Sequence, residues 1–295
     1  MSATQIITLI AARGSNQLDH ATALRLSSAV DASAMTVLSP GNAVELISDA
    51  DNPTQSIEAK LDDPEAVDIA VQPWREERRK KLLLADMDST MIQQECIDEL
   101  AAEVGVKEHV SEITRRAMNG EIEFDAALRE RVALLKGLPA SIVDKVIATR
   151  IELMPGGPEL VRTMRKHGAY CALVSGGFTD FTSRIAEIIG FQENRANQLE
   201  KKEGLLTGKV LEPILGKQAK LDTMNVLCER LQLSHDDVLA VGDGANDLAM
   251  IEAAGLGVAI HAKPSVAAQA DVRIDRGDLT ALLYLQGYSE DEFVR

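Results

Sequence analysis

Two carboxylates, Asp86 and Asp88, follow a short apolar run in the segment KLLLADMDST, residues 81–90. Asp86 is the first acidic residue after the run, and a carboxylate there can act as a nucleophile that divides phosphoryl transfer into two easier steps. Asp88 can protonate the leaving oxygen and then activate water as a base. Because a DxD pair is common by chance, this pair predicts phosphoryl chemistry only with support from other segments.

Two further motifs give that support. The residues SGGF follow the apolar run Tyr170–Val174, and the residues GDGAND follow the run Val238–Val241. Each motif alone is also typical of a simple turn. All three in this order, at the ends of corresponding apolar runs, indicate one site.

The residue types in these motifs suit a phosphate and a metal ion. The hydroxyl of Ser175 and the backbone N–H of Gly176 can hold phosphoryl oxygens, because glycine lets a backbone approach closely. Asp86 and Asp243 can share a Mg²⁺ ion, which prefers carboxylates, waters and phosphate oxygens as ligands. Asn246 can donate to phosphate or substrate from the start of the next helix.

The apolar runs themselves predict the elements that position these residues. Continuous runs such as Leu82–Ala85 and Leu256–Ile260, without polar alternation, are typical of parallel strands buried on both faces. Helical patterns lie between the runs, so we expect an α/β fold with a Rossmann-like, doubly wound parallel sheet over residues 82–295. Ligands bind beyond the carboxyl ends of such strands, where the motifs lie.

Two regions depart from this alternation. Residues from about 93 to 150 show consecutive amphipathic helices without strands, which predicts a helical cap over the active site. Residues 1–74 predict a small α/β module with strands at Ile6–Ala11, Met35–Leu38, Val44–Ile47 and Val67–Val71. Residues 75–81, REERRKK, are interpreted as a solvated linker rather than a binding patch.

The composition limits the partners. The 295 residues include 31 basic and 46 acidic residues and carry a formal charge of −15, so a nucleic-acid partner is not expected. The three cysteines are widely spaced, which favours neither disulfides nor a zinc site. No apolar run approaches the roughly 20 residues that span a bilayer, and no signal peptide is evident. We expect a soluble, cytoplasmic protein without a membrane partner.

The motifs DMDST, SGG, a lysine and GDGAND resemble the four motifs of the haloacid dehalogenase superfamily of phosphohydrolases, over residues of about 80 to 275. Within that superfamily the chain is similar to the phosphoserine phosphatases. The resemblance implies a Rossmann-like core, a small helical cap, Mg²⁺ as cofactor and an aspartyl-phosphate mechanism. It also implies the hydrolysis of O-phospho-L-serine in serine biosynthesis.

The resemblance also implies roles for individual residues in the core. It adds the backbone carbonyl of Asp88 to the metal ligands Asp86 and Asp243. Of the two lysines in GKQAKLD, Lys220 fits the spacing of the family better than Lys217 as the cation of the phosphate site. Asp247 is expected to support the site by holding a metal-bound water or the neighbouring lysine.

In the cap, the resemblance assigns the two ends of an amino acid. Glu95 matches the position that meets the substrate ammonium, and Arg131 matches the carboxylate partner, with Arg129 as a nearby competitor. Without the resemblance, Glu95 and Arg131 are ordinary surface charges. Met118 and Phe124 align with apolar residues that close over the substrate. Cys96 is interpreted as core packing.

Several alternatives remain open from the sequence. The substrate could be another small phospho-amino acid, such as phosphothreonine or phosphohomoserine, or the chain could be a phospho-acceptor domain without enzymatic turnover. The N-terminal module resembles a short, degenerate amino-acid-binding domain of the ACT type, so feedback by serine through it is a hypothesis. A homodimer formed through this module is compatible with the sequence, although no feature demands one.

Overall fold

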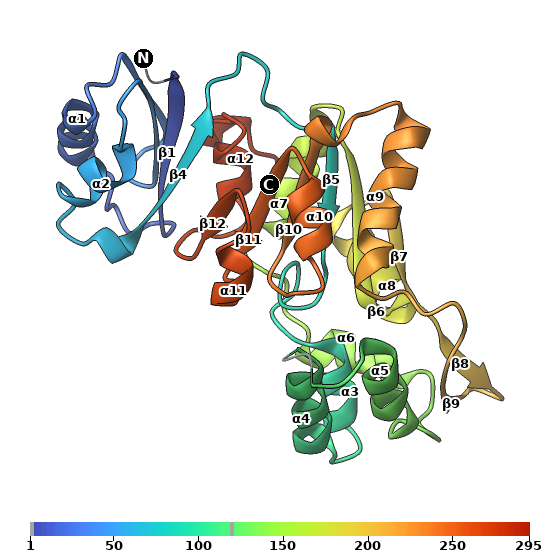
Figure 1. Cartoon of the computed structure of the whole chain (residues 1–295). Helices are drawn as coiled ribbons and strands as arrows, with labels where there is room; N and C mark the ends of the chain where they lie inside the picture. The colour runs from blue at the N-terminus through green and yellow to red at the C-terminus, as the bar shows by residue number, and fades with distance from the viewer. Residues whose placement is uncertain (1–2, 119–120) are drawn as a thin grey trace.

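The computed structural model describes residues 3–118 and 121–295. Figure 1 shows three lobes: the N-terminal module, the central core and a helical cap below it. The predicted α/β fold with a parallel sheet, a helical insertion and a small N-terminal module is confirmed.

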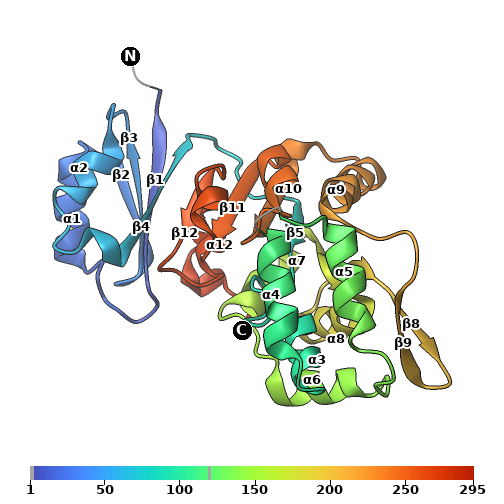
Figure 2. The same cartoon turned by 60° about the horizontal axis from the view of Figure 1, so that its bottom comes forward.

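The N-terminal module is a four-stranded antiparallel sheet in the order β2-β3-β1-β4. Its chain order is β-α-β-β-α-β, as in ferredoxin-like folds. Both helices lie on one face of the sheet, as Figures 1 and 2 show, and the other face packs on the core through Ile10 and Ala70. The elements are β1 Gln5–Ala11, α1 His20–Ala29, β2 Ala34–Ser39, β3 Ala43–Ser48, α2 Pro53–Glu58, a 3₁₀ turn Pro64–Ala66 and β4 Val67–Pro73.

The core is a six-stranded parallel sheet in the order β12-β11-β10-β5-β6-β7. Leu83 and Ala85 on β5 pack into one apolar cluster, whereas Leu82 and Leu84 pack into a second cluster on the opposite face. This explains the unbroken apolar run, because both faces of the strand are covered. The strand order reverses between β5 and β10, and such a switch point is where open α/β sheets bind ligands.

The core elements have the following bounds: β5 Leu82–Ala85, α7 Gly157–Lys166, β6 Tyr170–Phe178, α8 Thr179–Ile189, β7 Glu193–Asn197, α9 Lys217–Leu231, a 3₁₀ turn His235–Asp237, β10 Val238–Gly242, α10 Leu248–Ala253, β11 Leu256–Ile260, α11 Pro264–Ala267, β12 Val272–Ile274, α12 Ala281–Tyr284 and a final 3₁₀ turn Glu290–Glu292. None of the helices in the described ranges has the length and apolar character that crossing a bilayer requires.

The cap is made of α3 Cys96–Ala102, α4 Lys107–Met118, α5 Phe124–Ala133 and α6 Ile142–Arg150. Its two connections to the core run side by side, since Ile92 pairs with Leu153 and the N–H of Met154 donates to the carbonyl of Met91 at 2.9 Å. The chain therefore enters and leaves the cap through two paired segments beside the end of β5.

A hairpin of β8 Leu199–Lys202 and β9 Leu205–Val210 was not predicted. Its two-residue turn, Glu203-Gly204, has positive φ at both positions, the conformation that favours tight hairpins. The hairpin belongs to the core by sequence but bonds to the cap, because Leu206 exchanges backbone hydrogen bonds with the Gly137–Leu138 segment. The hairpin thus gives the core a second attachment to the cap.

The expectation of a solvated linker at residues 75–81 is wrong for Lys80, whereas Arg79 and Lys81 are exposed. Lys80 is buried and its ammonium donates to the carbonyls of Asp236, at 2.7 Å, and Gly255, at 3.1 Å. Arg79 pairs with Glu292 at 2.8 Å. Lys80 and Arg79 thus contact carbonyls and a carboxylate of the core, whereas Arg78 pairs with Glu45 of the N-terminal module. The charge pattern alone does not reveal these contacts.

Candidate active site

The residues after β5 form the centre of the site. The N–H of Asp86 donates to the carbonyl of Val241 at 3.1 Å, which continues the pairing of β5 with β10 for one residue. Asp86 is buried, and the intervening Met87 is fully buried in the main apolar cluster. Asp86 and Asp88 both line one cavity between core and cap.

Lys220 lies between two carboxylates. Its ammonium is 2.7 Å from Asp86 and 2.5 Å from Asp247, and all three side chains are almost completely buried. Burial by itself lowers the pKa of Lys220, but the charges of Asp247 and Asp86 outweigh this and raise it. Lys220 is therefore a permanent cation. Lys217, the alternative, is exposed and only lines the cavity.

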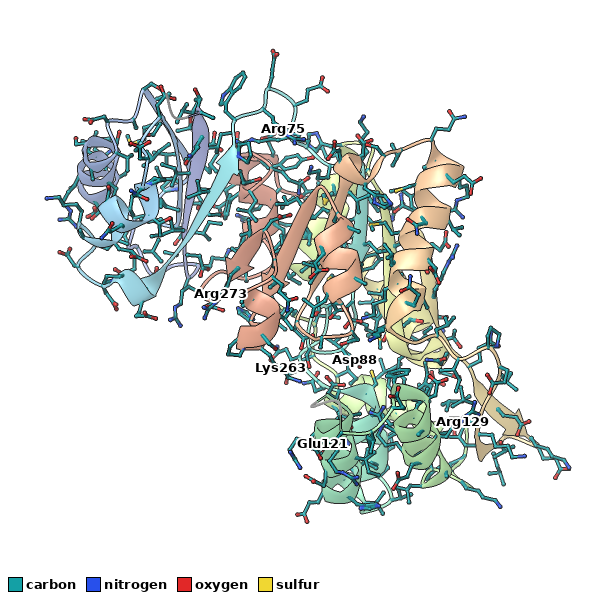
Figure 3. The ribbon with its side chains drawn as sticks, viewed as in Figure 1. Arg75, Asp88, Glu121, Arg129, Lys263 and Arg273 are labelled. Carbon is teal, nitrogen blue, oxygen red and sulfur yellow. The ribbon has the colours of Figure 1, made fainter. Side chains whose placement is uncertain are left out.

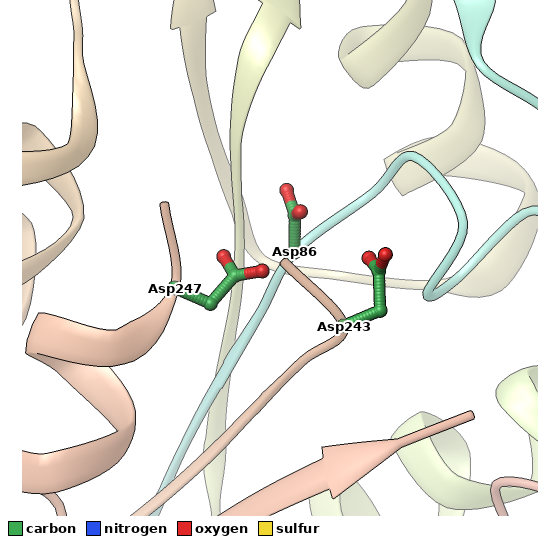
Figure 4. A group of neighbouring side chains, drawn as sticks. All are labelled: Asp86, Asp243 and Asp247. Atoms are coloured by element: carbon green, nitrogen blue, oxygen red, sulfur yellow. The ribbon is translucent and has the colours of Figure 1, made fainter. Parts of the chain in front are cut away.

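Three carboxylates are close enough to hold a metal ion. Asp86, Asp243 and Asp247 offer oxygens that all lie within 4.8 Å of one another, and Figure 4 shows them side by side. Burial and the charge of Asp247 raise the pKa of Asp243 to about 6, although Thr90 donates to it at 3.1 Å. One lysine does not neutralise this many carboxylates, so the group is compatible with a bound cation.

Asp88 has different surroundings from Asp86. Its carboxylate accepts from the N–H of Cys96 at 2.9 Å and from the hydroxyl of Ser175 at 3.1 Å. Burial raises the pKa of Asp88 despite these hydrogen bonds. Burial and the charge of Asp247 also raise the pKa of Asp86 well above its usual range, although the ammonium of Lys220 opposes this. Burial, then the charge of Asp88, raises the pKa of the Cys96 thiol well above its usual range, which leaves that thiol protonated.

The SGG segment packs tightly against Asp88 on one side and against Phe124 of the cap on the other. Strand β6 continues through this segment to Phe178, so the prediction that it ends at Val174 is wrong. Its register with β7 shifts between Val174 and Phe178, which accommodates the irregular glycines. A Cβ at Gly177 would lie 2.9 Å from an oxygen of Asp88, and one at Gly176 would lie 3.2 Å from the ring of Phe124.

The cap contributes one acid and one base to the cavity. Glu95 accepts from the hydroxyl of Ser89 at 2.9 Å; burial and the charge of Asp88 raise its pKa to about 8. Arg131 is buried and donates to the hydroxyl of Thr114 at 3.0 Å and to the carbonyl of Ala127 at 3.1 Å. Burial lowers the pKa of Arg131, and the charge of Glu95 opposes this.

The competitor Arg129 does not face the cavity. Its side chain is half exposed and pairs with Glu212 at the surface. Figure 3 shows Asp88 between the core and the cap helices, with Arg129 on the outside of the cap. The side chain of Met118, which was expected to close over the substrate, lies outside the described residues.

The cavity has a volume of about 850 Å³, a size typical of small-molecule sites. It brings together most of the predicted residues from the ends of β5, β6 and β10 and from the cap. Those that line it are Asp86, Asp88, Glu95, Phe124, Arg131, Ser175, Gly176, Asp243 and Asn246. Lys220 and Asp247 do not line it: the ammonium of Lys220 pairs with both Asp86 and Asp247.

Sequence reasoning missed the hydroxyls that hold these charges. Thr90 donates to Asp243, Ser89 to Glu95, and Thr114 accepts from Arg131. Thr90 and Ser89 stand inside the DMDST motif, so their positions offered a signal. Thr114 lies in the predicted amphipathic helices of the cap, and nothing in its sequence neighbourhood distinguishes it.

Residues 83–252 match the family model of the haloacid dehalogenase-like hydrolases, and the chain belongs to this family. Within it, the chain resembles the phosphoserine phosphatases. It is 44% identical over 217 residues to the phosphoserine phosphatase of Archaeoglobus fulgidus, an alignment that covers 73% of this chain and 63% of that relative. Part of that relative's length thus has no counterpart in the alignment.

Solved structures agree with this placement. The probable phosphoserine phosphatase of Vibrio cholerae has a TM-score of 0.77 and 34% identity, covering 98% of this chain and 88% of that one. A substrate-bound phosphoserine phosphatase has a TM-score of 0.66 and 41% identity, covering 70% of this chain and 99% of that one. The first similarity includes the N-terminal module.

Proposed function

We propose that this protein hydrolyses O-phospho-L-serine to L-serine and phosphate, through a phosphorylated Asp86. One observation carries the proposal: a single cavity joins the Asp86–Lys220 pair of the core to Glu95 and Arg131 of the cap. The first pair suits a phosphoryl group and the second suits an amino acid. The phosphoserine phosphatases among its relatives support the same conclusion.

In the first step, an oxygen of Asp86 attacks the phosphorus atom and the bond from phosphorus to the serine oxygen breaks. Asp88 gives its proton to that departing oxygen as a general acid. The products are serine and an acyl phosphate on Asp86. Ser175, the N–H of Gly176 and Lys220 would hold the charge that spreads over the phosphoryl oxygens.

In the second step, water attacks the phosphorus atom of the acyl phosphate. The Asp88 carboxylate takes the proton of the water, and the bond from phosphorus to Asp86 breaks. Inorganic phosphate leaves, and Asp86 is restored as a carboxylate. Asp88 thus regains the proton that it gave to serine, so the cycle balances.

For the metal we propose Mg²⁺, held by Asp86, Asp243 and the backbone carbonyl of Asp88, with Asp247 fixing Lys220 behind it. When bound, this ion would neutralise charge on the carboxylates and the phosphoryl group. We expect chelation to abolish turnover and added Mg²⁺ to restore it. Full activity of a metal-free enzyme would contradict this assignment.

At the amino-acid end, the carboxylate of Glu95 would bind the substrate ammonium and the guanidinium of Arg131 its carboxylate. Asn246 would donate to the phosphate, while Phe124 and Met118 would cover the substrate from the cap. A free amino acid, rather than a residue within a peptide, carries both charges that these partners require. We place the reaction in serine biosynthesis, in the cytoplasm.

The test is phosphate release from L-phosphoserine with Mg²⁺, measured beside L-phosphothreonine and a sugar phosphate. We expect multiple turnovers with phosphoserine as the preferred substrate. Preference for another compound would keep the mechanism and overturn the substrate. A single, long-lived phosphorylation of the protein without turnover would support a phospho-acceptor domain instead.

A further inference from the structure

Asn197, the last residue of β7, lies behind the phosphate end of the cavity and has no role in the mechanism above. It is 1% exposed. Its side-chain amide donates to the carbonyl of Gly176 at 2.9 Å and to that of Leu215 at 3.2 Å. Its side-chain oxygen accepts from the N–H of Leu215 at 2.7 Å. One buried side chain therefore uses both its donor and its acceptor groups on two separate segments.

Those two segments are neighbouring parts of the cavity wall, since one amide nitrogen reaches the carbonyls of both. Gly176 follows Ser175 at the cavity, and Leu215 precedes Gly216, the residue that caps α9 and also lines the cavity. Lys220 lies on the first turn of α9. Asn197 thus connects the backbone that is to hold phosphoryl oxygens with the helix that carries the site's ammonium.

The irregular ladder explains why a side chain is needed there. The register of β6 with β7 shifts between Val174 and Phe178, so regular strand pairing does not set the position of Gly176. Phe178 and Asn197 are paired across the strands, which brings the Asn197 side chain level with the glycine carbonyl. Because these groups are buried, each would be left without a partner if the amide were removed.

We propose that Asn197 is a positioning residue for the phosphate subsite, holding Gly176 and the start of α9 at the separation that a phosphoryl group requires. This inference rests on the proposed function, since it assumes that the two segments bind phosphate. Its distinctive consequence is selectivity: losing Asn197 should weaken the phosphate end of the cavity and leave the amino-acid end intact.

The experiment compares Asn197→Ala with Asn194→Ala in the full-length, Mg²⁺-loaded protein. Asn194 is on the same strand, but its side chain accepts from Thr182 at 2.8 Å, on α8, and does not line the cavity. For Asn197→Ala we expect binding of inorganic phosphate to weaken about tenfold and kcat to fall about 10–100-fold, as misplacement of catalytic groups does. Inhibition by L-serine should stay within about twofold, and Asn194→Ala should change none of these values.

Unchanged phosphate affinity in a folded Asn197→Ala protein would overturn the proposal. Equal losses of phosphate and serine binding would also overturn it, because they indicate a general structural role. If the alanine variant fails to fold, Asn197→Asp keeps the shape and the acceptor for Leu215 and removes the amide donors. Phosphate binding is measured without turnover, so it decides this proposal even if the wild-type protein does not hydrolyse phosphoserine.

Discussion

The two ends of the cavity hold their charges in different ways. At the core end, Lys220 contacts Asp86 and Asp247 directly, so opposite charges of the protein partly offset one another. At the cap end, Glu95 and Arg131 are each held by a neutral hydroxyl, that of Ser89 and that of Thr114. A hydroxyl fixes the direction of a charged group and leaves its charge available to a ligand.

This difference indicates a division of labour. The core end is preorganised for a reaction whose charge develops on the phosphoryl group, and that reaction is the same for many substrates. The cap end presents Glu95 and Arg131, which have no ion-pair partner among the described residues, to the part of the substrate that distinguishes one compound from another. Substitutions at the core end should therefore affect turnover, and those at the cap end should affect substrate choice.

The largest effect should come from the nucleophile. Asp86→Asn removes the attacking carboxylate while keeping its shape, and we expect kcat to fall by at least about 10³-fold for every phosphomonoester tested. The matched control is Asp222→Asn, because Asp222 is an exposed carboxylate on α9 that accepts from the side-chain amide of Gln218 at 3.1 Å. If Asp86→Asn kept a substantial rate that differed between substrates, the division of labour would be contradicted, because the core end would then contribute to selectivity.

Substitutions at the cap end should give a smaller and substrate-dependent loss. We expect Arg131→Met to lower kcat/KM for phosphoserine about 100-fold, through loss of charged hydrogen bonds to the carboxylate. The same variant should have the wild-type kcat/KM for phosphoethanolamine, because that compound has no carboxylate. Glu95→Gln should lower kcat/KM for phosphoserine but leave kcat/KM for 3-phosphoglycerate unchanged, because that compound has a hydroxyl in place of the ammonium.

Steady-state kinetics with these three compounds measure both variants. Arg129→Met is the control for Arg131, because its surface pair with Glu212 is outside the cavity. Equal losses with all substrates would show that the cap residues act on the chemistry rather than on recognition.

The acidity of Glu95 predicts a pH dependence. Its raised pKa of about 8 means that the carboxyl is mainly protonated at pH 7, whereas binding an ammonium requires the carboxylate. We therefore expect 1/KM for phosphoserine to rise about tenfold per pH unit up to pH 8 and then to level off. Glu95→Gln should remove this slope. A KM for the wild type that is constant from pH 6 to pH 9 would contradict the account.

The smallest effect should come from the hydroxyl that directs Arg131. Thr114→Val keeps the size of the side chain and leaves the guanidinium without that acceptor. We expect KM for phosphoserine to rise about 3–10-fold with kcat little changed, the size of one hydrogen bond to a charged group. Thr114→Ser keeps the hydroxyl and should retain a KM near that of the wild type. A fall in kcat alone would contradict the division of labour.

The predictability of the site follows the same division. The core end could be predicted because its residues follow buried strands whose apolar runs, such as Leu82–Ala85, are visible in the sequence. At the cap end, the sequence did not distinguish Arg131 from Arg129 without the family resemblance. The burial of one and exposure of the other depend on how α5 packs against α4, which is a tertiary property.

The contacts between distant segments could not be predicted. The β8–β9 hairpin and the amide of Asn197 join segments whose spacing in sequence carries no periodic signal. The length of β6 was underestimated because its last residues, Ser175–Phe178, include glycines that usually end a strand. In each case the deciding factor was a partner elsewhere in the chain.

The central claim is that Asp86 becomes covalently phosphorylated. The most direct test is to mix the Mg²⁺-loaded protein with L-phosphoserine, quench in acid during the first turnover, and map the phosphate by mass spectrometry. The account predicts phosphate on the peptide that contains Asp86, and none in Asp86→Asn. Turnover of phosphoserine without any phosphorylated peptide would contradict it, because water would then attack the substrate directly.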